Sequence, residues 1–335
     1  MKKSTLTFIH LLIFSNLIYS QNETPMFEIS VTKHLMGTVV EATVRHDQVS
    51  ACKNALFLAF SEMERVENLL SCHKNDSEIA RINQASGIRP VRVSLETLQI
   101  LQRAKSYSKQ FDGVFDVSIG PVSELWGFNS DAEFSVPENR QLEQALRLVD
   151  YRKIILSEKD TTAFLARKGM KIDLGGIAKG YAIDRGARVL KDNGVIHFLL
   201  NAGGDIYVSG KKDAQNDWRI GVKHPRNENE LVADFNFSNG AVATSGDYER
   251  FVEINGQRLH HILDPRTGRP AKSCQSATVI AESAEKADVL ATFLFIAGVQ
   301  KAEKFLPEKT SCLFIDEQNQ FFASGFLKGA SNPNK

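Results

Sequence analysis

VADFNFSNGAVATSGDYERFVEINGQRLHHIL, residues 232–263, contains the turn dipeptide Asn-Gly twice, at Asn239-Gly240 and at Asn255-Gly256. On either side of both dipeptides, apolar and polar residues alternate as they do in half-buried β-strands. An Asn-Gly dipeptide between two such strands is typical of a two-residue hairpin turn, because both residues tolerate positive φ. The stretch therefore predicts two antiparallel hairpins.

Further strands and helices are predicted on both sides of this stretch. Strands are expected in RKIILS (152–157), TAFLAR (162–167), FLLNAGGDIYVSG (198–210) and SATVIA (276–281), and in a last hairpin over residues 311–324. Helices are expected over 50–71 with a core-facing stripe, from Ser94 to Gln110, from Pro137 to Val149, and after residue 283; the stripe comprises Ala55, Leu58, Ala59, Met63, Val66 and Leu70. Hairpins interleaved with helices indicate an α+β fold of antiparallel sheets with packed helices, not a doubly wound parallel sheet.

KIDLGGIAKGYAIDRGARVL, residues 171–190, is typical of a short strand, a Gly175-Gly176 bend and an amphipathic helix. Backbone N–H groups at such a helix start attract anions. The glycine spacing fits neither the dinucleotide fingerprint nor the P-loop. Two alternatives stay open: the glycines bring a phosphate close, or they only allow tight packing of strand on helix. Likewise, Asp173 is either part of the anion site or a helix N-cap.

Composition describes an ordinary globular chain of 335 residues, 42% hydrophobic and 24% charged, with a net charge of +1. This balance gives no indication of a nucleic-acid partner. Cys52, Cys72, Cys274 and Cys312 show no metal-ligand spacing, and we expect buried free thiols. Because Cys52 and Cys72 occupy one predicted helical stretch, they are too far apart to pair.

The N-terminus, residues 1–20, predicts a secretory signal peptide, with a basic start, an apolar run and a polar exit. We expect cleavage near Ser20 and a single domain over residues 21–335. An uncleaved anchor is the alternative, although an apolar run of about 14 residues is short for crossing a bilayer. The protein is then exported and periplasmic, and associated with the inner membrane only if the signal is uncleaved.

Two loops carry polar residues that packing alone does not require. FDGVFDVSIGP, residues 111–121, places Asp112 and Asp116 beside an aromatic ring and a proline, which a plain turn would also do. HHILDPRTGRPA, residues 260–271, begins with His260 and His261 at a strand end. Since adjacent strand residues point to opposite faces, at most one of these imidazoles faces inward. An inward histidine is either structural or catalytic.

Asp288 and Thr292 lie four residues apart on the last long predicted helix, and they share one face of it. The rest of that face is apolar. A carboxylate and a hydroxyl in such surroundings suggest a hard cation such as Mg²⁺, which prefers oxygen ligands. The alternative is a threonine hydrogen-bonded to its own helix and a solvated aspartate.

Several motifs in fixed order resemble those of the ApbE family of FAD:protein FMN transferases. They are MGT from Met36, NDSEIARIN from Asn75, FDGVFDVSIGPVSELWGF from Phe111, DLGGIAKGYAID from Asp173, LLNAGGDIYVSG from Leu199, AVATSGDYERF from Ala241, HHILDPRTGRPA from His260 and ADVLATFLFIAG from Ala287. The resemblance implies a tunnelling-fold-like α+β core, dependence on Mg²⁺, and FAD as substrate. It also implies transfer of FMN to a threonine or serine of an acceptor flavoprotein in a membrane redox complex, with release of AMP.

The same resemblance assigns roles to individual residues. Positions that contact FAD in the family are occupied here by Met36, His73, Val114, Phe115, Asp116, Asp173, Lys179 and Ile262, and magnesium-ligand positions by Gly176, through its carbonyl, Asp288 and Thr292. His73 stands where some members have tyrosine, and Ala291 where some have a third metal-binding aspartate. A water or a phosphate oxygen can replace that carboxylate, since Mg²⁺ keeps several such ligands.

The transfer reaction needs a base for the acceptor hydroxyl. His261 is the predicted catalytic residue, because an unperturbed imidazole accepts protons near neutrality, with Asp264 or Asp173 as substitutes. Two other functions use the same residues. One is an FAD pyrophosphatase that produces FMN and AMP, and the other is a non-catalytic periplasmic flavin carrier.

Overall fold

The computed structural model describes residues 12–14, 26–128, 134, 136–306 and 310–329. Within them, nine strands form one sheet in the order β1-β2-β3-β7-β8-β11-β16-β17-β18, and every neighbouring pair is antiparallel. Their bounds are β1 (Leu12–Phe14), β2 (Phe27–Leu35), β3 (Thr38–His46), β7 (His197–Ala202), β8 (Asp205–Ser209), β11 (Asn239–Gly246), β16 (Ser276–Ala281), β17 (Ser311–Ile315) and β18 (Phe321–Ala323). The prediction of an α+β fold on antiparallel sheet is confirmed.

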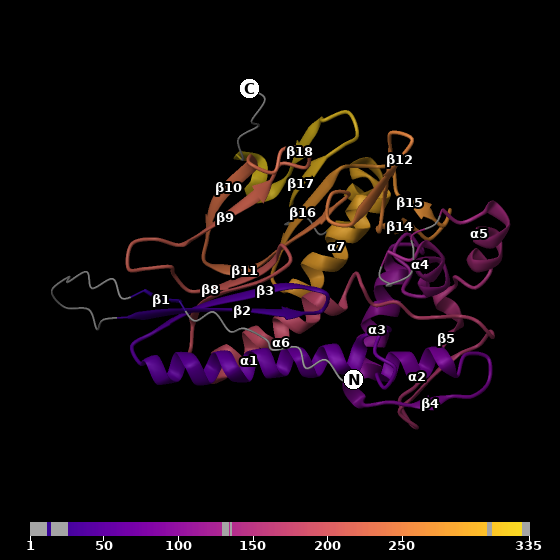
Figure 1. The fold of residues 1–335 in the computed structure, drawn as a ribbon, viewed down its shortest axis with the longest axis horizontal. Helices are drawn as coiled ribbons and strands as arrows, with labels where there is room; N and C mark the ends of the chain where they lie inside the picture. The colour runs from indigo at the N-terminus through magenta and orange to yellow at the C-terminus, as the bar shows by residue number, and fades with distance from the viewer. Residues whose placement is uncertain (1–11, 15–25, 129–133, 135, 307–309, 330–335) are drawn as a thin grey trace, which may run out of the picture.

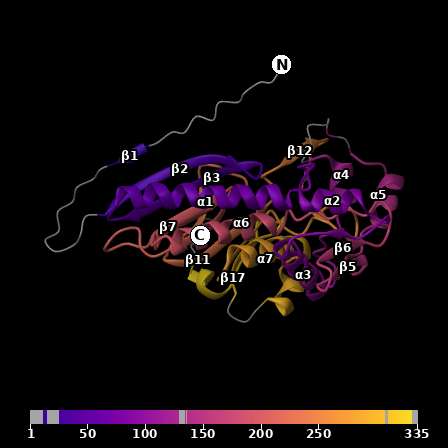
Figure 2. The ribbon, with the colours of Figure 1, turned by 90° about the horizontal axis from the view of Figure 1, so that it is seen from below.

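Three long helices cover one face of this sheet, as Figures 1 and 2 show: α1 (Val49–Leu70), α6 (Ala178–Asp192) and α7 (Ala284–Ala297). The pair β9 (Trp218–Lys223) and β10 (Leu231–Phe237) covers part of the other face. Alternate residues of β11 divide between the two layers, because Ala241 and Ala243 belong to the helix-side core while Val242 packs with Trp218 of β9. The sheet is therefore buried on both sides here.

The remaining elements form smaller units around this core. One small sheet consists of β4 (Val91–Arg92), β5 (Ile154–Ser157) and β6 (Thr162–Leu165), and two strand pairs are β12 (Phe251–Ile254) with β13 (Gln257–His260) and β14 (Leu263–Asp264) with β15 (Arg269–Pro270). The other α-helices are α2 (Glu78–Gln84), α3 (Leu95–Gln110), α4 (Gly120–Trp126), α5 (Asn139–Leu146) and α8 (Val299–Ala302). The 3-10 helices are η1 (Tyr151–Lys153), η2 (Glu303–Phe305) and η3 (Gly325–Gly329). None of the helices in the described residues has the length and apolarity to cross a membrane. The predicted signal peptide, apart from β1, lies outside these residues and stays a prediction.

One of the two predicted hairpins is present and the other is wrong. Asn255 and Gly256 have φ of 51° and 74°, and they join β12 to β13 in register. Asn239 and Gly240, in contrast, are the first residues of β11, which pairs with β8 and β16 and not with β10. Residue 238, between the end of β10 and the start of β11, connects the small β9–β10 sheet to the nine-stranded sheet. Local sequence marks the break but not the change of sheet.

The first long helix corrects two further predictions. The predicted core-facing stripe is confirmed for Ala55, Ala59, Met63, Val66 and Leu70, but Leu58 is 37% exposed, and the buried face also includes Leu56 and Phe60. The helix ends at Leu70, and Cys72 lies beyond it, half-buried. All four cysteines are free thiols, as expected, although Cys72 is not fully buried.

Helices α6 and α7 approach each other closely at Gly180. A Cβ atom added there would lie 2.3 Å from the Ala284 carbonyl oxygen, a distance that real side chains do not reach. The absence of a side chain at this position therefore allows the backbones of the two helices to touch. Gly186, on the same helix, faces side chains rather than backbone: such a Cβ would lie 2.9 Å from Sδ of Met63 and 3.5 Å from Cδ1 of Leu200.

Gly180→Ala should therefore destabilise the fold by about 1–3 kcal/mol or more, because the two helices must separate. Gly186→Ala is the matched control in α6, and it should change stability by less than about 1 kcal/mol, because Met63 can move and alanine favours a helix. Urea unfolding followed by circular dichroism measures both. Equal effects of the two substitutions would contradict the close approach.

Candidate functional site

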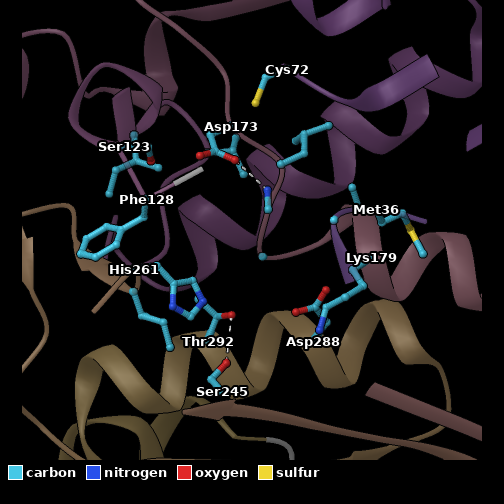
Figure 3. A pocket seen from close by; sticks show the side chains of 18 of the residues that line it. Met36, Cys72, Ser123, Phe128, Asp173, Lys179, Ser245, His261, Asp288 and Thr292 are labelled. Carbon is cyan, nitrogen blue, oxygen red and sulfur yellow. Dashed lines mark hydrogen bonds between the residues drawn. The ribbon is translucent and has the colours of Figure 1, made fainter. Parts of the chain in front are cut away.

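A cavity of about 840 Å³ lies where the diglycine bend meets α7. Segments far apart in sequence line it: the β2–β3 turn, the chain after α1, the 115–119 loop, residues 173–179, the end of β11 with the chain after it, residues 261–263 with Pro265, and one face of α7 (Figure 3). A cavity of this volume is in the range of small-molecule and cofactor sites.

The structure brings nearly all of the predicted site residues together at this cavity. Its lining includes Met36, His73, Phe115, Asp116, Asp173, Gly176, Lys179, His261, Ile262, Asp288 and Thr292. Val114 is the exception, because it is half-buried against the main core and is not part of the lining.

The diglycine bend and α7 make direct contact. A Cβ atom on Gly176 would lie 3.3 Å from the Thr292 hydroxyl oxygen, and the backbone N–H of Gly180 donates to Oδ2 of Asp288 at 3.1 Å. The Thr292 hydroxyl also lies 3.3 Å from Oγ of Ser245, so it is directed at a neighbouring strand rather than only at its own helix (Figure 3).

These groups fit a hard divalent cation. Burial, reinforced by Asp205, raises the pKa of Asp288 to about 7 and outweighs the opposing effects of Lys179 and the Gly180 N–H, so a bound cation would stabilise the charged carboxylate. A carboxylate, a hydroxyl and a backbone carbonyl are oxygen donors of the kind Mg²⁺ selects. No group of three or more His, Cys, Asp or Glu side chains in the described residues could hold a metal, so the remaining ligands would come from water or phosphate.

Asp205 is a residue that the sequence analysis missed. It is the first residue of β8, it is 1% exposed, and its Oδ2 lies 2.6 Å from Nζ of Lys179. Burial of Lys179 opposes its positive charge, but the carboxylates of Asp205 and Asp288 raise the pKa of Lys179. The signal in the sequence was an aspartate directly after Gly203-Gly204, but its partner is distant along the chain.

Asp173 shapes the diglycine bend and is not a helix N-cap. Helix α6 begins only at Ala178, and no side chain caps it. The Asp173 carboxylate instead accepts the N–H of Gly175 at 2.9 Å, and its own N–H donates to Val117. The strand predicted before the bend is reduced to one bridge between Lys171 and Ile119.

Asp116 fixes the loop at the other side of the cavity. One carboxylate oxygen accepts the backbone N–H of Ser118 at 2.8 Å and its hydroxyl at 2.6 Å, and the other accepts the N–H of Tyr151 at 3.1 Å. Burial raises the pKa of Asp116 in spite of these bonds. Its side chain is thus committed to loop structure, while the neighbouring Phe115 ring lies 3.0 Å from where a Gly176 Cβ would be.

The two adjacent histidines face opposite ways, as expected. His260 is buried edge-on against Phe295, and its Nε2 lies 2.9 Å from the carbonyl oxygen of Ala271. His261 lines the cavity, and its Nδ1 lies 3.3 Å from the Arg250 carbonyl oxygen. Because a carbonyl can only accept, this Nδ1 carries the proton and Nε2 remains the basic atom. Burial, reinforced by Arg250 and His260, lowers the pKa of His261 to about 3.

Comparison with known proteins gives a consistent family. The model of the ApbE family matches residues 36–314. Among curated proteins, the FAD:protein FMN transferase of Klebsiella pneumoniae is 36% identical over 80% of this chain and 82% of the relative, and that of Treponema pallidum is 32% identical over 89% and 87%. Among solved structures, the ApbE protein of Thermotoga maritima superposes with a TM-score of 0.84 at 32% identity, covering 90% of this chain and 98% of that one. The flavin transferase ApbE of Vibrio cholerae gives 0.81 at 27%, covering 92% and 100%.

The geometry of His261 predicts an imidazole that stays neutral well into the acid range. Since a histidine is charged only below its pKa, and this pKa is about 3, His261 should remain uncharged from pH 8 down to about pH 4. Its ¹⁵N shifts, assigned by comparison with a His261→Gln variant, should show a protonated Nδ1 throughout. A titration midpoint near 6.5 would contradict this placement.

Proposed function

The chain belongs to the ApbE family, and we propose that it transfers FMN from FAD to a threonine or serine hydroxyl of an acceptor flavoprotein, with Mg²⁺ bound and AMP released. The relatives reported above are named FAD:protein FMN transferases, so the chain is a transferase acting on a flavin nucleotide. The observation that carries the finer proposal is the approach of Gly176 to Thr292 together with the hydrogen bond from Gly180, in the first turn of α6, to Asp288 at the cavity.

The diglycine end of the cavity is suited to a pyrophosphate. First-turn N–H groups of α6 and the ammonium of Lys179 bring positive charge to this end. Asp288, Thr292 and the carbonyl of Gly176 would hold the cation, which when bound neutralises charge on the pyrophosphate oxygens. The absence of a side chain at Gly175 and Gly176 leaves room for a ligand close to the backbone.

His261 is better placed than its substitutes to accept the proton, although burial lowers its pKa to about 3 and makes it a weaker base than the unperturbed imidazole predicted from the sequence. The negative charge of a bound pyrophosphate would raise that pKa. Its Nε2 is the unprotonated nitrogen of a cavity-lining imidazole, whereas Asp264 pairs with Arg266 at 2.7 Å outside the lining and Asp173 bonds Gly175. In the proposed step, the acceptor oxygen bonds to the FMN-side phosphorus, the phosphoanhydride bond breaks, and AMP leaves. The hydroxyl proton goes to Nε2 of His261.

The acceptor and the location belong to the same proposal. An acceptor flavoprotein of a membrane redox complex, in an exported location, is supported by the family resemblance and by the signal-like N-terminal segment. Both stay predictions.

Transfer is distinguished from hydrolysis and from simple binding by its protein product. The purified protein should convert FAD, Mg²⁺ and a threonine-containing flavoprotein acceptor into AMP and an acceptor band that stays fluorescent in a denaturing gel. His261→Ala should bind FAD normally but yield at least about 100-fold less product, the contribution typical of a general base. AMP and FMN without a fluorescent band would show a pyrophosphatase, and bound FAD without AMP would show a carrier.

The hydroxyl of Thr292 should be needed for metal binding. Thr292→Val keeps the shape of the side chain but removes one oxygen ligand, so the Mg²⁺ concentration for half-maximal transfer should rise about 10-fold or more. Thr97→Val is a matched control, because Thr97 is a buried threonine on α3, remote from the cavity lining. It should lower the melting temperature without changing the Mg²⁺ requirement. An unchanged requirement in Thr292→Val would remove Thr292 from the metal site.

A further inference from the structure

We propose that Asp205 is a positioning residue that holds the Lys179 ammonium away from Asp288, and so keeps the Asp288 carboxylate available to a divalent cation. The inference rests on the proposed function, because it gives Asp205 a role at the same metal site. Three charged side chains from three elements carry it: Lys179 from α6, Asp205 from β8 and Asp288 from α7.

The main contact of the Asp205 carboxylate is the ammonium of Lys179. Its Oδ2 contacts Nζ of Lys179 at 2.6 Å, and its Oδ1 accepts only a long bond, 3.4 Å, from the backbone N–H of Thr244. With 1% of its surface exposed, the carboxylate has almost no contact with solvent. The Lys179 side chain, in contrast, is partly accessible to solvent: 26% of it is exposed, and it lines the cavity.

Stability does not explain this pair. Removing two charges from water costs about as much as their attraction returns, and replacing a buried ion pair by apolar residues is often neutral or stabilising. Lys179 is also the second residue of α6, where the helix dipole disfavours a cation. Both facts indicate that the ammonium serves the cavity rather than the fold.

The same ammonium acts on two carboxylates. Burial raises the pKa of both Asp205 and Asp288, and the ammonium of Lys179 opposes that rise in each; against its own burial, the two carboxylates raise the pKa of Lys179. Figure 3 shows the labelled Lys179 and Asp288 side chains converging at one end of the cavity. Glu249, from the chain after β11, is a weaker neighbour of the ammonium.

A long lysine side chain is flexible, and its ammonium is a point charge that can change partner. Without Asp205, the ammonium can turn to the Asp288 carboxylate, which converges with it at the same end of the cavity (Figure 3). An ammonium on Asp288 would repel a divalent cation and occupy its ligand. Asp205 therefore prevents an internal competitor from blocking the metal site.

The test is Mn²⁺ binding, read from the electron paramagnetic resonance of free Mn²⁺, with the full chain, saturating FAD and no acceptor. In Asp205→Asn the dissociation constant for Mn²⁺ should rise about 10-fold or more, because a competing charge now lies on Asp288. In the double variant Lys179→Met/Asp205→Asn, which lacks the competitor and is kept saturated with FAD to offset the loss of the ammonium beside the pyrophosphate, it should return to within about threefold of wild type. Asp247→Asn is the control: Asp247 is a buried aspartate paired with Arg226 at 2.6 Å and absent from the lining, and its loss should lower stability without changing Mn²⁺ affinity.

The outcomes separate this inference from the proposed function. If wild type with FAD binds no Mn²⁺, the metal-dependent function fails and the role of Asp205 fails with it. If wild type binds Mn²⁺ and Asp205→Asn binds it equally well, only the role of Asp205 fails. If Asp205→Asn does not fold, the double variant decides: wild-type affinity supports the inference, and a folded double variant with weak binding overturns it.

Discussion

The contact between α6 and α7 at Gly180 is the constraint on which the site depends. Because Gly180 has no side chain, the α6 backbone reaches the carbonyl of Ala284, and its N–H reaches Asp288. This contact places the diglycine bend, four residues earlier, against Thr292, one helical turn further along α7. A hydrogen bond and a missing methyl group thus bring together two segments that are more than 100 residues apart.

Asp184 forms a second link between the same two helices, this time from a side chain of α6 to the backbone of α7. Its carboxylate, on α6, accepts the N–H groups of Ala284 and Glu285 at 2.7 and 2.9 Å, and so caps the start of α7. Helix α7 is buried over most of its length, and the Ser283 hydroxyl accepts the N–H of Lys286 at 3.3 Å, so Asp184 supplies the acceptors for the two N–H groups before it. Each helix therefore supplies a hydrogen-bonding group that the other one needs, and the relative position of the cavity residues is fixed from both ends.

Features encoded locally could be predicted from the sequence, and long-range pairings could not. Asn255-Gly256 and the Ser94 cap of α3 were predictable because a few neighbouring residues determine them. The hairpin predicted at Asn239-Gly240 was wrong, because here the dipeptide begins a strand of another sheet. Which sheet that strand joins depends on residues far away in the sequence. The cavity residues were found through motif order, which preserves a site without describing its geometry. Asp205 was missed because its partner, Lys179, lies on another element.

The bond between His261 Nδ1 and the carbonyl of Arg250 has an evolutionary consequence. Every amino acid carries that oxygen, so no substitution at position 250 deletes the group that orients the imidazole. Side chains around the entrance are then free to diverge, while the imidazole keeps the orientation that the proposed proton transfer requires. Because the main chain orients His261, side chains around it can change during evolution without changing the orientation of the imidazole.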